Sequence, residues 1–497
     1  MKKIFQDSEL QFFEKASFDR NPLHRDDSYA RKTQFGQTVV YGMYATLFAL
    51  GEWLAGRNIR LSTIKGEFKK PLLTGTEYDL TVNESSTRTD ITVSRNGTKY
   101  LKLRIGPASI KNLPFHWPKS PAFSPRADAA DSVQFPETDT LEIPGTRYSS
   151  GWNGGLQPPP LFRLRRDQLP FEQLTAFLWS SYFAGMEVPG RQALFSAFEF
   201  NFESAESSAD DFQISPLRVE LDRRFNRLTI QGTATGIRSL TISSFERPVS
   251  VQISLDAIRK SVGTGNSMAG KKVLITGASR GFGAVLAQTF ALQGAQILLN
   301  FFQSRQEAEA LAQNIAAIGP RPVLIQGNAA NPQEWKSVKD EVGAIDFLIN
   351  NASPVIPAIN FKEQSAEEIV SFVSRSLELF LVPCSQLLPQ MSPGGTVIQI
   401  SSVFVTQPEA GFSHYVAAKS AAEAVMRSLA EEYSDLRFLI FRAPRMLTDQ
   451  TNTVVPIQNM SSPSDVAKVL LDCLDKFEPQ KNFQLFSFDS LREIVGM

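Results

Sequence analysis

Three side chains near the carboxyl end of the sequence could together deliver a proton to a carbonyl oxygen. Tyr415 and Lys419 stand in "YVAAK", and Ser402 lies thirteen residues before Tyr415, in "ISSV". Residues four apart share one face of a helix, so the ammonium can favour the ionised phenol and lower its apparent pKa. Such a phenol can donate a proton to the alkoxide that forms when a ketone accepts a hydride, while the serine hydroxyl holds the carbonyl oxygen. Taken singly, the first two residues would be a core tyrosine and a solvated lysine.

An aspartate and a histidine near the amino end form a second candidate pair. Asp19 and His24 lie in "SFDRNPLHRD", and Pro22 between them prevents a regular helix. An imidazole has a pKa of about 6.5, so His24 can take a proton from a water molecule that the carboxylate orients. The alternative is an Asx-type turn, in which Asp19 and Asn21 bond their own backbone and His24 is merely exposed. On these residues alone, the turn is the better interpretation.

Short apolar runs alternate with helical stretches in the carboxyl-terminal part of the chain. The runs are "KVLITG", "QILLNF", "PVLIQG", "DFLINN", "GTVIQIS" and "RFLIFRAP". Strands that alternate with helices form a parallel sheet covered on both faces. The stretch "TGASRGFG", residues 276–283, follows the first run and opens the first helix. Its glycines let the backbone approach a pyrophosphate, and the helix end offers N–H donors.

This glycine loop, "NNAS" after the fourth strand, "ISSV" after the fifth strand and "YVAAK" together resemble the short-chain dehydrogenase/reductase family, over roughly residues 270–497. The resemblance implies an α/β Rossmann-like doubly wound parallel sheet and a ketoacyl reductase type of activity. It implies that Tyr415 is the acid/base, that Lys419 tunes it and contacts the ribose, and that Ser402 orients the substrate. The cofactor site that it implies consists of Gly277, Ser279, Arg280, Gly281, Phe282, Gly283, Asn300, Asn328, Asn351, Tyr415 and Lys419.

The residues around the glycine loop favour NADP over NAD as the cofactor. NAD enzymes place an acidic residue at the end of the second strand, where it meets the ribose 2′-hydroxyl. Here that end reads "LLNFFQSR" and offers Asn300 instead. Arg280, inside the glycine loop, can face a 2′-phosphate, with Arg305 as a second cation.

The chain departs from the family pattern at three points. The family usually has an asparagine on the fourth helix, which completes a proton relay through water. The matching stretch "VSRSLELF" offers Ser374, Arg375 or Ser376 instead. Asn328 replaces the aspartate that usually follows the third strand, and Arg445 replaces the glycine that usually follows the sixth.

The first half of the chain repeats one pattern twice. The apolar, helix-like run "TVVYGMYATLFALGEWLAG" precedes alternating segments that end in "TDITVSRNGTKYLKLRIG". In the same way, "LTAFLWSSYFAGMEVPG" precedes segments that end in "RLTIQGTATGIRSLTISSF". A long apolar helix followed by period-2 alternation predicts, in each block, a central helix wrapped by antiparallel strands.

The motif D-x-N-P-L-H followed by "FGQTVVYGMY" resembles the MaoC-like, R-specific enoyl hydratase family, over about residues 5–110. The resemblance implies an α+β hotdog fold in which Asp19 and His24 are catalytic. It also implies that Gly42, at the start of the long helix, directs its N–H at a thioester carbonyl. The departures are Phe18 and Tyr41, where the family has a glycine and a histidine.

The second block has no such Asp/His pair, and its only nearby histidine is His116. We therefore predict a double hotdog followed by the Rossmann-like domain. Residues 1–112 carry the hydratase motif, residues 113–258 form a catalytically silent second hotdog, and residues 268–497 form the reductase. A Gly/Ser-rich linker is expected over residues 259–272.

The composition excludes several other classes of protein. Lys+Arg and Asp+Glu both total 51, so the chain lacks the basic footprint of a nucleic-acid-binding protein. The two cysteines, Cys384 and Cys473, allow neither a disulfide framework nor a CxxC metal site, and we predict no metal. No apolar core follows the start "MKKIFQDSEL", and no apolar run is long enough to span a membrane, so we expect a cytoplasmic protein.

The two activities that the resemblances imply act on consecutive intermediates. A reductase makes a 3-hydroxyacyl thioester from a 3-ketoacyl thioester, and a dehydratase converts the product to a 2-enoyl thioester. We therefore predict an NADPH-dependent 3-ketoacyl reductase and dehydratase of fatty-acid or polyketide type, which acts on thioesters of acyl carrier protein or CoA and forms a homo-oligomer. Two alternatives stay open: a β-oxidation-type enoyl-CoA hydratase and 3-hydroxyacyl-CoA dehydrogenase, and a ketoreductase with a non-catalytic hotdog binding module.

Overall fold

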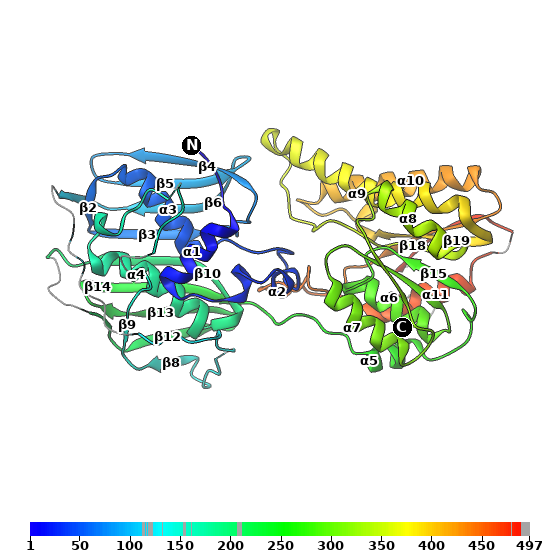
Figure 1. The fold of residues 1–497 in the computed structure, drawn as a ribbon, viewed down its shortest axis with the longest axis horizontal. Coiled ribbons are helices and arrows are strands. Elements are labelled where there is room, and N and C mark those ends of the chain that lie inside the picture. Colours follow the sequence, from blue (N-terminus) through cyan, green and yellow to red (C-terminus); the bar gives the residue numbers. More distant parts are fainter. Residues whose placement is uncertain are drawn as a thin grey trace. The chain divides into compact units, whose positions relative to one another are not determined.

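The computed structural model describes residues 1–111, 115, 117, 123–131, 133–152, 156–160, 162–205, 211–478 and 480–488. The chain divides into two compact units (Figure 1). The first unit runs from Met1 to Val249 and includes Thr453–Pro456. The second unit runs from Ser250 to Asn452 and resumes at Ile457.

The antiparallel strands of the first unit form one continuous sheet of twelve strands. Its main path runs β1-β4-β5-β6-β3-β10-β14-β13-β11-β9, and β12 links β13 to β8. The strands are β1 (Lys2–Ile4), β3 (Thr63–Phe68), β4 (Glu77–Glu84), β5 (Thr89–Arg95), β6 (Thr98–Ile105), β8 (Thr140–Ile143), β9 (Thr146–Tyr148), β10 (Ala193–Phe202), β11 (Phe212–Ile214), β12 (Leu217–Asp222), β13 (Arg227–Ala234) and β14 (Ile237–Glu246). A separate pair joins β2 (Asn58–Leu61) to β7 (Ala108–Lys111).

The two sequence blocks meet in the middle of this sheet. Strand β3 of the first block pairs with β10 of the second in antiparallel register, from Thr63 opposite Asn201 to Glu67 opposite Ala197. Because this register fixes the side chains of both strands on defined faces, it also fixes how the helices of the two blocks meet.

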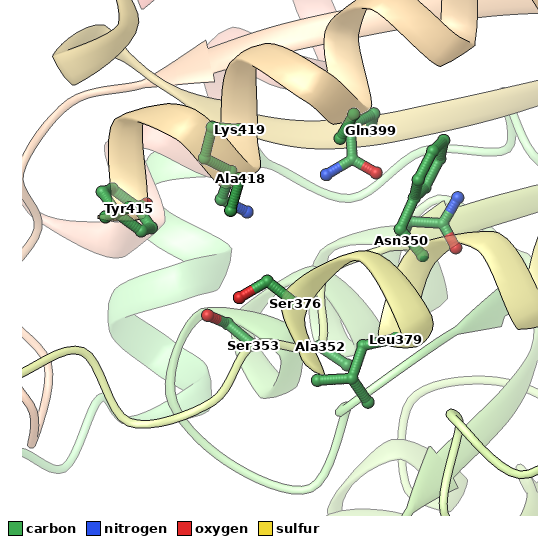
Figure 2. Close-up of a pocket in the computed structure, with 11 residues that line it drawn as sticks. Asn350, Ala352, Ser353, Ser376, Leu379, Gln399, Tyr415, Ala418 and Lys419 are labelled. Atoms are coloured by element: carbon green, nitrogen blue, oxygen red, sulfur yellow. The ribbon is translucent and has the colours of Figure 1, made fainter. Parts of the chain in front are cut away.

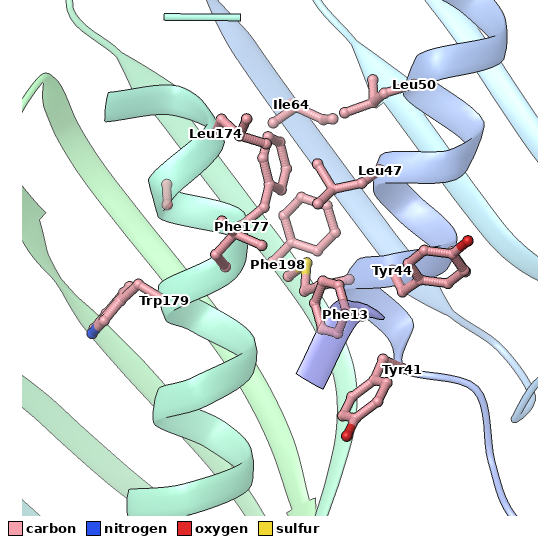
Figure 3. Packing of buried hydrophobic residues seen from close by; sticks show 14 of the residues in the cluster. Phe13, Tyr41, Tyr44, Leu47, Leu50, Ile64, Leu174, Phe177, Trp179 and Phe198 are labelled. Atoms are coloured by element: carbon pink, nitrogen blue, oxygen red, sulfur yellow. The ribbon is translucent and has the colours of Figure 1, made fainter. Parts of the chain in front are cut away.

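Two apolar helices form the centre of the first unit, one from each block. They are α3 (Gly42–Leu54) and α4 (Phe171–Tyr182), and α4 is buried at every position. Figure 3 shows Leu47 and Leu50 of α3 and Leu174 and Phe177 of α4 pointing toward one another, with Phe198 of β10 nearby. The repeated arrangement of helix and strands that the sequence predicts is present in both blocks.

Both helices are shorter than the apolar runs that contain them. Helix α3 begins only at Gly42, because Val39 and Val40 are extended and bond to Leu72 and Leu73 across the chain. Beyond α4, the chain continues as a π-helical turn, Phe183–Glu187. Two shorter helices, α1 (Asp7–Ser17) and α2 (Asp27–Arg31), flank the Asp19 region.

The second unit contains a seven-stranded parallel sheet in the order β17-β16-β15-β18-β19-β20-β21. The strands are β15 (Lys272–Ile275), β16 (Gln296–Phe301), β17 (Val323–Gln326), β18 (Ile345–Asn350), β19 (Met391–Ser402), β20 (Arg437–Ala443) and β21 (Phe483–Ser487). The order reverses between β15 and β18, and in such sheets a crevice at the carboxyl ends of these two strands binds the ligand.

Helices cover both faces of this parallel sheet. The core on one face includes residues of α5 (Leu255–Val262), α6 (Gly281–Leu292), α7 (Arg305–Ala316) and α11 (Pro463–Asp475). The core on the other face includes residues of α8 (Pro332–Val342), α9 (Ala366–Leu387) and α10 (Ser413–Glu432). The doubly wound parallel sheet predicted from the sequence is therefore confirmed. Among the described residues, no helix has the length and apolar character that crossing a membrane requires.

The region expected to be a linker is partly helical. Helix α5 covers the first residues of the 259–272 stretch and starts behind Ser254, whose hydroxyl accepts from the Ala257 N–H at 3.2 Å. Ile258 is 0% exposed and belongs to the core of the second unit. The prediction was wrong there because the predicted linker began at residue 259 and so divided the apolar residues Leu255, Ile258 and Val262, which pack against this core at helical spacing. The second unit consequently starts before residue 268.

We expect Ile258→Ala to destabilise the second unit by about 2–5 kcal/mol, because it removes a fully buried side chain and leaves a cavity. Chemical denaturation of the full chain, followed by a probe in the second unit, measures the loss. Lys260→Ala is the control, because Lys260 is exposed on the same helix and its loss should change stability by less than about 0.5 kcal/mol. Equal stabilities of the two variants would show that α5 is only an appended segment.

Two candidate active sites

The glycine loop of the second unit has a backbone that other residues adopt only with strain. Gly277 and Gly281 have φ angles of 63° and 57°, in the left-handed region that favours glycine. A Cβ at Gly283 would overlap the carbonyl oxygen of Gly277. Helix α6 starts at Gly281, so the unpaired N–H groups of its first turn lie beside this loop. The loop and the helix end fit a dinucleotide phosphate.

Two of the predicted cofactor residues form hydrogen bonds to the backbone of this loop. Asn300, which is 2% exposed, accepts from the Gly277 N–H at 3.4 Å and donates to the Gly327 carbonyl at 3.1 Å. Asn351 donates to the carbonyl oxygens of Thr276 and Gly277 at 3.2 and 3.1 Å. Both side chains therefore hold the loop in shape through their amide groups.

The other predicted cofactor residues lie around the same loop. Arg280 is the N-cap residue of α6 and is half-buried, as is Ser279. Phe282 is buried in the core of the second unit. Asn328 follows β17, and its side chain accepts from the Ala330 N–H at 3.1 Å. Arg305 stands at the start of α7 and pairs with Glu309 at 3.6 Å.

The structure brings the predicted proton donor and its partners together. Tyr415 and Lys419 lie on α10, and Ser402 ends β19. A hydrogen bond joins Ser402 to Tyr415, and the Lys419 Nζ lies 5.7 Å from the centre of the Tyr415 ring. Lys419 also donates to the Ile400 carbonyl at 2.8 Å. These contacts place all three groups of the predicted acid–base set at one end of β19.

The pKa of Tyr415 differs from the sequence-based expectation. Burial raises the pKa of its phenol above the ordinary value, and the hydrogen bond from Ser402 opposes this rise. Burial also lowers the pKa of Lys419 to about 8, against the opposing charge of Glu423. The expected lowering by Lys419 does not dominate, because both groups are withdrawn from water and the ammonium bonds to the Ile400 carbonyl. A protonated phenol is the form that can donate a proton during reduction.

A pocket beside these groups is lined by polar side chains from β18, α9, β19 and α10 (Figure 2). Ser376 of α9 lines it together with Tyr415 and Lys419. Of the three alternatives on the fourth helix of this sheet, Ser374 instead bonds to Glu378, and the Arg375 Nε donates to the Ser371 carbonyl. Of the three alternatives, Ser376 is therefore the one that lines the pocket, and its hydroxyl donates to the Phe372 carbonyl at 2.8 Å.

The same pocket contains two residues that the motifs did not indicate as catalytic. Asn350 and Gln399, which are 3% and 4% exposed, line it. Within the described part of the chain, their Oδ1 and Oε1 atoms have no hydrogen-bond partner. The sequence feature that could have indicated Gln399 is its polar side chain in the middle of an otherwise apolar strand, "GTVIQIS".

In the first unit, Asp19 lies directly behind the end of α1. Phe18 has a φ of 60°, which explains why a glycine suits this position in the family that the motif resembles. The Asp19 carboxylate is 2% exposed and accepts from the Asn21 N–H at 3.1 Å and from the Ser181 hydroxyl at 2.7 Å. Burial raises the pKa of Asp19 to about 7, although the Ser181 hydrogen bond opposes the rise.

His24 ends the short 3₁₀ helix Pro22–His24 and is half-buried. Its Nδ1 lies 2.6 Å from the Val39 carbonyl oxygen. A carbonyl can only accept, so Nδ1 carries the proton and Nε2 of the neutral ring has a free lone pair. Burial lowers the pKa of His24 to about 4, so the neutral ring prevails at neutral pH.

Tyr41 links the two candidate residues. Its hydroxyl donates to the Asp19 carbonyl at 2.7 Å, and its ring lies 4.0 Å from the His24 ring, centre to centre. Each catalytic candidate is held by other groups, and neither bonds to the other in the described part of the chain. The Asx turns of the alternative interpretation are present at Asp19 and Asn21, but His24 is held in place by two contacts.

Gly42 stands where the resemblance requires a backbone donor. It is the first residue of α3, so its N–H belongs to the first helical turn, which lacks partners within the helix. A Cβ at this position would lie 2.8 Å from the Phe68 ring. The close approach of that ring explains why a glycine opens the helix.

The second block contributes Ser181 to the surroundings of Asp19, a residue that the sequence motifs missed. Its only signal was a pair of serines, "LWSSYF", in an otherwise apolar helix. His116 lies outside the described residues. Ser181 contacts the Asp19 carboxylate and not a substrate, so it does not contradict the prediction that this block contributes no catalytic residue. That absence stays a prediction. Among the described residues, no group of three or more His, Cys, Asp or Glu side chains could hold a metal ion.

Comparison with protein families supports both resemblances. Residues 4–103 match the family described as "MaoC like domain", and residues 271–454 match the family described as "short chain dehydrogenase". The identity and the order of the two predicted modules are confirmed.

The second module is also similar to individual proteins. It is 28% identical over 220 residues to 3-oxoacyl-[acyl-carrier-protein] reductase FabG of Staphylococcus aureus, covering 40% of this chain and 89% of that protein. A 3-oxoacyl-[acyl-carrier-protein] reductase of Synechocystis is 27% identical over 210 residues, covering 39% and 85%. A crystal structure of a short chain dehydrogenase from Burkholderia cenocepacia in complex with NADP has a TM-score of 0.41 and 25% identity, covering 45% of this chain and 97% of that one.

Proposed function

We propose that this chain, in which a MaoC-like domain precedes a short chain dehydrogenase domain, is a bifunctional enzyme of fatty-acid or polyketide type. It reduces 3-ketoacyl thioesters with NADPH and dehydrates the resulting 3-hydroxyacyl thioesters. The observation that carries the proposal is the presence in one chain of two acid–base sets, Tyr415 with Ser402 and Asp19 with His24. The two sets suit consecutive reactions on neighbouring carbons of one acyl chain.

In the reductase site, this chain's own residues manage the proton. NADPH, when bound, supplies the hydride. Ser402 orients the substrate carbonyl, and the Tyr415 phenol, which burial keeps protonated, donates its proton to the oxygen. Lys419 stabilises the phenolate that remains. Residues of the glycine loop, Arg280 among them, hold the cofactor.

In the dehydratase site, the proton positions suit elimination of water. The free Nε2 of His24 takes a proton from C2 of the 3-hydroxyacyl thioester, and the protonated Asp19 carboxyl gives its proton to the leaving hydroxyl, which departs as water. The Gly42 N–H stabilises the thioester oxygen. Dehydration should be fastest between about pH 4 and pH 7, where His24 is neutral and Asp19 is protonated.

The same proposal covers the domain organisation. Residues 1–112 and 113–249 are the two halves of a double hotdog that share one sheet through β3 and β10. Residues 250–258, which were predicted to end the second half, belong to the second unit. The first half supplies Asp19 and His24, and the reductase follows. The enzyme is proposed to be cytoplasmic and to form a homo-oligomer.

One assay of the purified full chain tests the proposal. The substrates are 3-ketoacyl thioesters of acyl carrier protein and of CoA, and NADPH oxidation and enoyl product are followed separately. We expect both signals, with enoyl product appearing after reduction. NADPH oxidation without enoyl product would favour a non-catalytic hotdog module, and faster turnover with NAD and 3-hydroxyacyl-CoA would favour the β-oxidation direction.

The cofactor preference gives a further prediction. We expect NADPH to be preferred over NADH, and Arg280→Ala to reduce that preference by about 10- to 100-fold, the range of a hydrogen bond to a charged group. The ratio of kcat/KM for the two cofactors measures the effect. Arg259→Ala is the control, because Arg259 is an exposed residue of α5 that pairs with Asp256 at 3.0 Å and lies outside the predicted cofactor site, so its loss should leave the ratio nearly unchanged. A wild-type preference for NADH would contradict the prediction.

A further inference from the structure

The second half of the first unit touches the Asp19 carboxylate, although it has no Asp/His pair of its own. Ser181, in the last turn of α4, donates its hydroxyl to Asp19 Oδ2 at 2.7 Å. It is 5% exposed, so this hydrogen bond is shielded from water. A Cβ at Gly185 would overlap the same carboxylate, which therefore fills the space above this glycine.

Further contacts fasten the motif loop to the same stretch of the second half. Asn21 Nδ2 donates to the carbonyl oxygens of Gly185 and Gly190, both at 2.9 Å. The Arg20 N–H contacts Met186 Sδ at 3.1 Å. These partners lie in or just after the π-helical turn Phe183–Glu187, and such turns are frequent at functional sites.

We propose that Ser181 is a positioning residue for dehydration, whose hydroxyl fixes the orientation of the Asp19 carboxyl group, so that the second half completes the acid–base site of the first. The inference rests on the proposed dehydratase function. It assigns a role to the half that lacks its own Asp/His pair. Gly185 of that half packs against the Asp19 carboxyl group, and Ser181 donates a hydrogen bond to it.

The charges around Asp19 decide which way its titration moves when this donor is lost. Glu14 on α1 raises the pKa of Asp19, and Arg25 pairs with Glu14 at 3.0 Å. The hydroxyl-bearing rings of Tyr41 and Tyr148 face Asp19 from two other elements, and its charge raises their pKa values. The hydroxyls of both tyrosines donate to backbone carbonyl oxygens, of Asp19 at 2.7 Å and of Ser17 at 2.8 Å, rather than to the carboxylate. Burial raises the pKa of Asp19, and the Ser181 hydrogen bond lowers it. Loss of the hydroxyl removes this lowering, so the pKa of Asp19 rises.

The test compares pH profiles of dehydration by the full chain. In the wild type, kcat/KM should fall above about pH 7, as Asp19 loses the proton that it must donate. In Ser181→Ala this limb should move upward by about one to two pH units, the equivalent of a hydrogen bond to a charged group. Ser181→Cys, with a weaker donor of similar size, should move it in the same direction. Ser181→Thr, which keeps the hydroxyl, should retain the wild-type limb.

Ser180→Ala is the matched control. Ser180 is the neighbouring buried serine of α4, and its hydroxyl donates to the Phe177 carbonyl at 3.0 Å, away from Asp19. Its removal should leave the limb in place. An unmoved limb in both Ser181→Ala and Ser181→Cys, or an equal movement in Ser180→Ala, would overturn the inference.

A second readout separates this inference from the proposed function. The infrared band of the protonated Asp19 carboxyl, assigned by its loss in Asp19→Asn, reports the titration without any substrate. If the wild type does not dehydrate but the band titrates at higher pH in Ser181→Ala than in the wild type, the dehydratase function fails while the positioning of Asp19 stands. If the band titrates identically in the two proteins, the positioning role is refuted whatever the activity.

Discussion

Tyr415→Phe is expected to reduce the rate of ketoreduction by about 10²–10⁴-fold, the contribution typical of a general acid. The substitution removes only the hydroxyl and keeps the ring that packs 6.0 Å from Phe404. Burial raises the pKa of the phenol, so it carries its proton across the neutral pH range. NADPH oxidation with a 3-ketoacyl thioester measures the loss.

The same variant should dehydrate 3-hydroxyacyl thioesters at the wild-type rate, because Asp19 and His24 belong to the other unit. Tyr433→Phe is the control for the substitution itself. Tyr433 directly follows α10, the helix that carries Tyr415, and the loss of its hydroxyl should leave ketoreduction unchanged. A Tyr415→Phe enzyme that still reduces at full rate would mean that another group supplies the proton.

Six of the seven strands of the parallel sheet could be predicted from the sequence, because each is a distinct apolar run between helices. Strand β21 at the edge of the sheet was not predicted; its run "FQLFS" is short and only half-buried. The candidate catalytic residues at the carboxyl end of β19 could be predicted as well. The acid–base set depends on local spacing, since Tyr415 and Lys419 share one helix and Ser402 ends the preceding strand. Residues four apart on one helix lie on the same face in any fold, so this part of the site can be predicted from spacing.

Features that depend on long-range packing could not be predicted in this way. Ser181 meets Asp19 across 162 positions of sequence, and that meeting depends on the pairing of β3 with β10. The support that Asn300 gives to the glycine loop depends on which way a buried side chain turns. The raised pKa of Tyr415 depends on burial, which spacing does not express.

Helix α5 shows a different reason for failure. Its sequence, "LDAIRKSV", turns Leu255, Ile258 and Val262 to the core, and the glycines and serines that follow suggest a loop. The predicted linker started at residue 259, so it divided this apolar spacing and passed over the Ser254 cap. Caps therefore deserve more weight than composition where a short helix borders a flexible-looking stretch.

His24→Ala is expected to reduce dehydration by about 10²–10⁴-fold and to leave ketoreduction intact. The reason lies in the two nitrogens of the ring. Nδ1 is committed to the Val39 carbonyl, the ring is held against Tyr41, and Nε2 is left as the base. Because burial lowers the pKa of His24 to about 4, this base is available throughout the neutral range. The measurement is the rate of enoyl formation from a 3-hydroxyacyl thioester.

His24→Asn separates catalysis from turn structure. The asparagine amide can still donate to the Val39 carbonyl, but it offers no nitrogen base. If His24 is the base, both variants lose dehydration, and His24→Asn keeps the thermal stability of the wild type better than His24→Ala. If His24 only fastens the turn, His24→Asn should dehydrate at nearly the wild-type rate. The Asx turns at Asp19 and Asn21 persist in either case, so the rates of these two variants decide whether the motif performs chemistry or only shapes the loop.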